Sequence, residues 1–185
     1  MIHYQITYAR RKTIGIQIKN GLVEVRAPFG YPEQLLFHAV NSRLNWIEAK
    51  LQQVADQERS RAQFAQGRDM EAESMAYRRR AETHIPERVA HFAQIMGVTV
   101  KKVSINGAKT RWGSCSTTGR LNFSWRLMMA SDAAIDYVVV HELAHLKQMN
   151  HSPQFWALVA QVLPDYQQQK AQLKALSKRI QLEGW

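Results

Sequence analysis

Two histidines and a glutamate in one short segment are the residues of this sequence best suited to chemistry. His141, Glu142 and His145 form a histidine-glutamate-x-x-histidine pattern. On a helix, His141 and His145 stand on one face about 6 Å apart along the axis, so they can share one cation. Glu142 is turned roughly 100° away, which makes it a poor third ligand but lets it reach a water beside the metal. The pattern predicts two zinc ligands and a general base at Glu142.

A third ligand is needed because a catalytic zinc uses three protein ligands and leaves one position for water. His151, six residues after His145, is the leading candidate. Asn150 and Ser152-Pro153 on either side of it indicate that the first helix ends near Met149 and that the chain turns back. Such a turn returns His151 to the metal.

This constellation predicts hydrolysis. Zinc lowers the pKa of a bound water toward 7, Glu142 takes the proton, and the hydroxide attacks a carbonyl or phosphoryl centre. The negative charge that develops needs a donor beyond zinc. Arg111, Tyr137 and His84 are the side chains we expect to contact the substrate or the transition state.

Residues around the histidines have both structural and functional interpretations. Asp136 or Asp165 could accept the free ring N–H of a ligating histidine, and the sequence does not choose between them. Phe155 and Trp156 are expected to pack against the ligand loop and fix it. The single cysteine, Cys115, is best interpreted as a small buried apolar residue, rather than as a nucleophile or a fourth ligand.

Several segments carry a resemblance to a known family: Thr110–Cys115, Leu121-Asn122, Asp136–His145, Asn150–Ser152 and Phe155-Trp156. In these residues the chain resembles the YgjP-like metal-dependent hydrolases, which are related to the SprT-like and WLM metallopeptidases of the zincin group. The resemblance implies zinc ligands at His141, His145 and His151 and a catalytic Glu142. It also implies a zincin-like catalytic half in which the motif helix packs beside a small sheet. Gln148 stands where metzincins have a glycine, so we do not assign the chain to that group.

The first part of the chain predicts a small antiparallel sheet and a helix. Apolar residues alternate with polar ones over residues 14–18 and 22–25, and Asn20-Gly21 between them is typical of a hairpin turn. From Glu33, apolar residues recur at near-helical spacing, which predicts one helix that extends past Val54. Residues 56–80 are polar and predict a solvated helix or a hinge.

The second part alternates helices and strands. Gly97 predicts a helix end and Pro86 a helix break or a new first turn near His84. Strands are expected over residues 98–105 and 110–125, the latter broken at residues 117–119. Ser131 is expected to cap a buried helix that carries the histidines, and helices follow Ser152-Pro153 and residues 163–165. We therefore predict an α+β fold, with an N-terminal sheet and helix at 1–70 and a catalytic half at 71–185 that together form one functional unit.

Composition limits the setting of this chemistry. The 185 residues are 45% hydrophobic, as expected for a packed protein. With one cysteine, no signal-peptide pattern and no apolar run of bilayer length, we expect a soluble cytoplasmic protein. The net charge of +10 favours contact with polyanions through a basic surface. The run Arg78–Arg80 could contact phosphates, although a solvent-facing position is the favoured interpretation.

Three functions fit these observations. The first is a zinc metallopeptidase, supported by the motif and by a strand near Asn122 that could pair with an extended peptide. The second is a metal-dependent hydrolase of nucleotides or phosphoanhydrides, which the positive charge favours. The third is a nucleic-acid-associated module with a structural metal, which fits less well because structural zinc sites are closed by four ligands and rich in cysteine. Neither the substrate nor the oligomeric state follows from the sequence.

Overall fold

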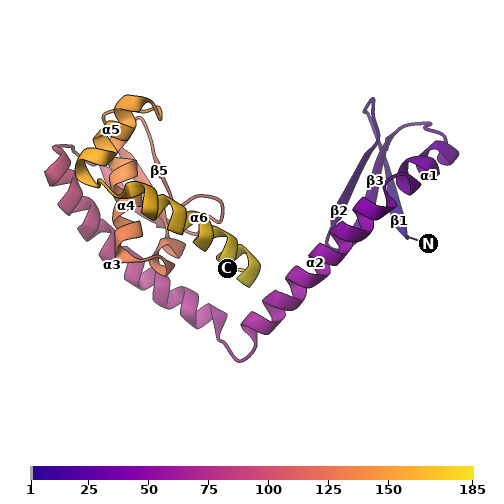
Figure 1. Ribbon diagram of the computed structural model, residues 1–185, viewed down its shortest axis with the longest axis horizontal. Coiled ribbons are helices and arrows are strands. Elements are labelled where there is room, and N and C mark those ends of the chain that lie inside the picture. Colours follow the sequence, from indigo (N-terminus) through magenta and orange to yellow (C-terminus); the bar gives the residue numbers. More distant parts are fainter. Residues whose placement is uncertain (1) are drawn as a thin grey trace. The chain divides into compact units, whose positions relative to one another are not determined.

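The computed structural model describes residues 2–185, which divide into two units at the step from Gln66 to Gly67 (Figure 1). Each unit contains a three-stranded sheet and helices. The predicted α+β fold class is confirmed. Among the described residues, no helix combines the length and the hydropathy that crossing a bilayer requires.

The sheet of the first unit is built on the predicted hairpin. Its strands are β1 (Tyr4–Ala9), β2 (Gly15–Lys19) and β3 (Leu22–Pro28), in the order β1-β3-β2. Asn20 and Gly21 both have positive φ, as a two-residue turn with right-handed strand twist requires. β3 lies in the middle, antiparallel to β2 but parallel to β1, so the sheet is mixed rather than wholly antiparallel.

Two helices follow where one was predicted: α1 (Glu33–Asn41) and α2 (Leu44–Ala65). The single-helix prediction is wrong because the chain bends at Ser42, whose hydroxyl donates to the carbonyl of Ala39. The bend lets Leu36 on α1 and Ile47 on α2 pack into one core. The full core comprises Val23, Val25, Ala27, Leu36, Val40 and Ile47. Burial of these apolar surfaces outweighs helix continuity.

The second unit begins with the long helix α3 (Met70–Met96). The side chain of Asp69 caps its start, and Gly97 ends it in the left-handed conformation, as predicted. The predicted break at Pro86 is wrong, because the helix continues through this residue. Ile85 and Val89 on either side of Pro86 are buried, so packing compensates for the hydrogen bond that proline cannot donate.

The second sheet consists of β4 (Lys102–Asn106), β5 (Gly113–Cys115) and β6 (Arg120–Ser124), in the order β4-β6-β5. β6 is parallel to β4 and antiparallel to β5. β6, the strand that contains Asn122, has a neighbour on each edge, so it has no free edge for a peptide. β5 is an edge strand of this sheet, and it contacts α4.

A short 3₁₀ helix, η1 (Trp125–Met129), leads to the last helices α4 (Asp132–Ala144), α5 (Pro153–Val162) and α6 (Tyr166–Glu183). Ser131 and Ser152 cap α4 and α5 through their side chains, as predicted. α4 is buried on most sides and contacts α3, α5, α6 and β5. This helix is therefore a rigid support for the residues at its end.

Candidate metal centre

The end of α4 presents the predicted histidine-glutamate pattern. The helix ends at Ala144, earlier than the predicted end near Met149, and His145 is its C-cap residue. The N–H groups of Leu146 and Lys147 then bond to carbonyls three residues back. This tighter turn is a common way to satisfy the last carbonyls of a helix. It starts the reversal that the sequence predicts a few residues later.

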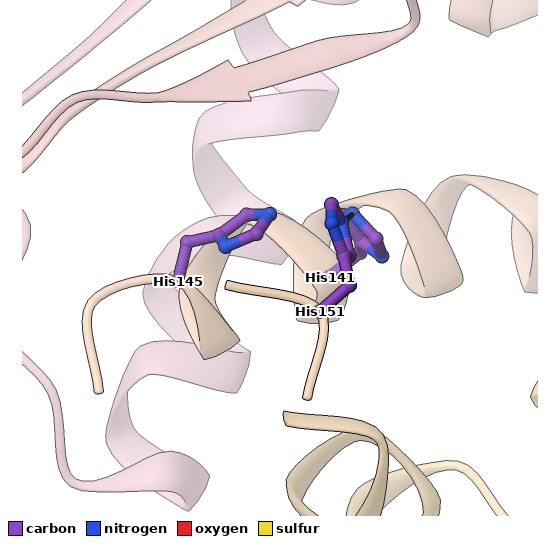
Figure 2. A group of neighbouring side chains, drawn as sticks. All are labelled: His141, His145 and His151. Carbon is purple, nitrogen blue, oxygen red and sulfur yellow. Dashed lines mark hydrogen bonds between the residues drawn. The ribbon is translucent and has the colours of Figure 1, made fainter. Parts of the chain in front are cut away.

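The reversal brings His151 to the other two histidines. Figure 2 shows the three rings together, with His151 carried in by the loop after the helix. His151 Nε2 lies 3.1 Å from His141 Nε2, and one nitrogen from each of the three rings lies within 4.8 Å of the others. Two nitrogens bound tetrahedrally to one zinc at 2.0–2.1 Å are about 3.3 Å apart. The pair His141 and His151 therefore already has about the spacing of two zinc ligands, and His145 offers a third nitrogen of the same type within 4.8 Å.

The protonation of the rings also fits a metal. Burial, and then the charges of His145 and His151, lower the pKa of His141 to about 3, so this ring is neutral as a ligand must be. The Nδ1 of His145 lies 3.2 Å from the carbonyl oxygen of Gln148, and it must donate there because a carbonyl only accepts. This bond leaves Nε2 of His145 as the free acceptor.

An aromatic floor supports all three rings. Phe155, fully buried at the start of α5, has its ring centroid 4.8 Å from His141, 4.6 Å from His145 and 4.8 Å from His151. Trp156 stacks on His151 at 5.7 Å. These contacts agree with the expectation that both residues pack against the ligand loop.

The carboxyl group of Glu142 is buried between α4 and β5. The side chain of Glu142 is 6% exposed. A Cβ on Gly113 would lie 2.7 Å from both Cγ and Oε1 of Glu142, so the strand approaches the carboxyl group as closely as a glycine allows. Burial raises the pKa of Glu142 to about 7, and the positive charge of Arg111 opposes this shift. The role of Gly113 in β5 is therefore close packing against this carboxyl group.

The predicted transition-state donors are only partly brought together. Tyr137 lies one turn before His141 on α4, with ring centroids 5.8 Å apart, and burial raises its pKa to about 12. Arg111 is exposed and acts on Glu142 through its charge. His84 lies away from the histidine cluster, because its Nε2 is 3.7 Å from Asp132, at the opposite end of α4. Nine helical residues, about 13 Å, separate that end from His141.

The other neighbours predicted for the histidines have different roles. Asp136 accepts two hydrogen bonds from Arg88, at 2.6 and 2.8 Å, and joins α4 to α3. Asp165 is exposed beside the start of α6. The partner that the sequence did not reveal is the backbone carbonyl of Gln148. Cys115 lies in β5 beside Glu142, and burial raises its pKa to about 11, so its thiol is protonated at neutral pH.

Comparison with known families agrees with this geometry. The family model for the YgjP-like metallopeptidase domain matches residues 12–75 and 70–176 of this chain. The chain belongs to the YgjP-like metallopeptidase family. Membership implies a metal-dependent hydrolase, and the histidine cluster is a place that could hold the metal.

Among solved structures, the chain is similar to the crystal structure of the metallopeptidase zymogen of Pyrococcus abyssi abylysin. The two share 26% sequence identity over 52% of this chain and 90% of the other, with a TM-score of 0.42. No curated protein matches the chain.

Proposed function

We propose that this chain is a zinc-dependent peptidase in which His141, His145 and His151 hold the metal and Glu142 is the general base. The observation that carries the proposal is the convergence of three imidazole nitrogens beside a buried carboxyl group on the same helix. Family membership supports peptide hydrolysis as the reaction. Three ligands from protein, rather than four, are typical of catalytic zinc.

Each residue of the site has its own proposed role in the reaction. Zinc, when bound, acts as a Lewis acid and lowers the pKa of water. Glu142 takes the proton from the attacking water and returns it to the leaving amine. Its burial against Gly113 holds the carboxylate in one orientation. The phenol O–H of Tyr137 and the guanidinium of Arg111 are the donors available for the oxygen of the attacked carbonyl.

An extended peptide fits the architecture of the site. β5 has β6 on one side only, so the backbone groups of its other edge can pair with a substrate strand. Gly113 in β5 contacts Glu142, so a peptide paired with this strand passes beside the general base. The alternative substrate class, nucleotides and other phosphoanhydrides, rests on net charge and on the arginines near the start of the catalytic half. A purely structural metal lacks the fourth ligand, since among residues 2–185 the cluster contains three.

The test combines metal analysis with one conservative substitution. The purified full chain is assayed for zinc and for turnover of a peptide panel and a nucleotide panel. Glu142→Gln keeps size and hydrogen bonding but cannot accept a proton, so peptide turnover should fall by roughly 10²–10⁴-fold. Zinc content and thermal stability should stay unchanged. Glu87→Gln, an exposed carboxyl on α3, is the matched control and should be fully active.

Other outcomes identify other roles. If Glu142→Gln loses zinc or stability together with activity, the carboxyl group is a ligand or a structural partner. An active, zinc-loaded Gln variant refutes the mechanism. Hydrolysis of nucleotides but of no peptide refutes the assigned substrate class.

A further inference from the structure

A second cluster of polar groups lies at the end of the second sheet, outside the histidine cluster. It joins the exposed Gly107 after β4, Trp125 and Arg126 at the start of η1, and Arg78 on α3. Trp125 is 2% exposed and Arg126 7% exposed. An arginine this deeply buried is uncommon unless an acceptor compensates for the lost water.

Two buried donors of this cluster lack acceptors. Arg126 donates through Nη1 to the carbonyl of Gly107 at 2.8 Å. Its Nε and the indole Nε1 of Trp125 are buried, and neither has a hydrogen-bond partner in the described chain. No ion pair joins Arg78 or Arg126 to a described acidic side chain. Such orphaned donors need an explanation in a folded protein.

The donors converge beside Gly107. A methyl group added to Gly107 would lie 3.5 Å from Nε1 of Trp125, 3.6 Å from Nη2 of Arg78 and 3.9 Å from Nη1 of Arg126. No heavy atom lies closer to that point apart from the glycine and its chain neighbours. Gly107 and Arg78 are exposed, so the cluster borders on solvent on their side, while the indole and Arg126 donors lie beneath them.

Two positive charges are held together here. The guanidinium carbons of Arg126 and Arg78 lie 4.3 and 5.4 Å from the ring centroid of Trp125. Burial, and then the charge of Arg78, lower the pKa of Arg126. Contact with the same indole therefore holds two cations close enough together to repel each other. An anion between them relieves both the repulsion and the unsatisfied donors.

We propose that Gly107, Trp125, Arg126 and Arg78 bind a phosphate dianion, either inorganic phosphate or the phosphate of a monoester. Two guanidinium groups match the two charges of a dianion, and the indole and Arg126 N–H groups match its several oxygens. Gly113, which contacts Glu142, is the strand partner of Phe123. Trp125 lies two residues beyond Phe123, so the proposed phosphate site is separate from the site of Glu142 and lies past the end of β6. The inference does not depend on the proposed peptidase activity.

The indole N–H of Trp125 gives a direct readout. The nitrogen-15-labelled full chain has five tryptophans, and Trp125→Phe identifies the resonance of Trp125 by its loss. Inorganic phosphate added at constant ionic strength should shift this resonance to saturation. Arg78→Gln should weaken binding by about tenfold, because one charge-assisted hydrogen bond is lost. Arg79→Gln, the exposed neighbour with the same charge change, should bind within about twofold of the parent.

A second variant keeps every donor. Gly107→Ala adds a methyl group at ordinary contact distance, so the fold should persist. The methyl nevertheless occupies the point where the donors meet, so phosphate binding should weaken by about tenfold or more. Unchanged binding in Gly107→Ala overturns the site.

Titrations with further ligands define the charge class of the bound anion and distinguish free phosphate from a phosphate monoester. Glycerol phosphate that binds more tightly than inorganic phosphate supports a monoester ligand, whereas the reverse order supports free phosphate. Acetate or dimethyl phosphate that binds as tightly as either overturns the dianion assignment. The proposal is also wrong if Trp125 shows no saturable shift, if Arg79→Gln matches Arg78→Gln, or if only the resonance of Trp156 beside the histidines responds.

Discussion

The two sheets of this protein have the same topology and different chemistry. In each, the third strand lies in the middle, parallel to the first and antiparallel to the second. In the first unit, the helices add only apolar side chains to the buried core. In the second, α4 places the carboxyl group of Glu142 against the edge strand. The sheet is a common scaffold, and the helix packed on it determines whether a site forms.

One glycine position makes the contrast specific. Gly15 is the first residue of β2 and Gly113 the first residue of β5, so they occupy equivalent places in the two sheets. A Cβ at Gly15 would meet the guanidinium end of Arg11 at 2.9 Å, and that end can move away. A Cβ at Gly113 would meet a buried carboxyl group that cannot. A larger residue should therefore be tolerated at Gly15, whereas Gly113 must stay a glycine for Glu142 to keep its position.

The largest expected effect tests whether chemistry is confined to the second unit. His151→Ala removes one of three proposed ligands, so zinc affinity should fall by more than the 10- to 100-fold typical of losing an outer-shell partner. A competition titration with a chelator measures it. His91→Ala, an exposed histidine on α3, is the control and should keep parental affinity. Parental zinc affinity in His151→Ala would contradict the three-histidine site.

A smaller effect should separate the equivalent glycines. Gly113→Ala should displace Glu142 and lower kcat by about tenfold or more with zinc retained, because general-base catalysis depends on exact placement of the carboxylate. Gly15→Ala should leave kcat unchanged, since only the mobile end of Arg11 must shift. Steady-state kinetics with metal analysis compares them. Equal kcat values for the two variants would remove the distinction drawn between the sheets.

A still smaller change is expected at the aromatic floor. Phe155→Leu keeps the site apolar but loses ring contacts with all three histidines, so zinc affinity should fall about tenfold, as for other supporting residues. The chelator titration applies again. If affinity is unchanged, Phe155 contributes to the core and not to ligand placement.

No effect is expected from the histidines of the first unit. His3 and His38 are exposed and belong to no described histidine cluster, so replacing both by glutamine should preserve turnover and zinc content. Circular dichroism verifies folding. Loss of turnover in a folded double variant would show that the first unit takes part in the reaction.

The features predictable from sequence are those set by local chemistry. The Asn20-Gly21 turn, the serine caps of α4 and α5, and the grouping of three histidines all depend on residues close in the chain. The break at Ser42 and the continuation of α3 through Pro86 depend on burial against distant segments, which periodicity does not encode.

The same reasoning explains which site residues the sequence misplaced. The sequence predicts His84 at the site, but α3 places it beside Asp132, at the far end of α4 from His141. The contact between Gly113 and Glu142 depends on how a strand and a helix approach, and no spacing in the sequence reports it. The four residues proposed to bind phosphate come from three separate segments, of which only Arg78 carried a signal in the sequence.

The loop between His145 and His151 has a consequence for how the protein acquires its metal. Only five residues separate these two side chains, and bonds at Leu146, Lys147 and Gln148 already close the turn. Joining the ends of so short a loop removes little chain entropy. We therefore expect metal binding to require almost no ordering of the backbone, so that the rate of metal uptake follows the concentration of free metal.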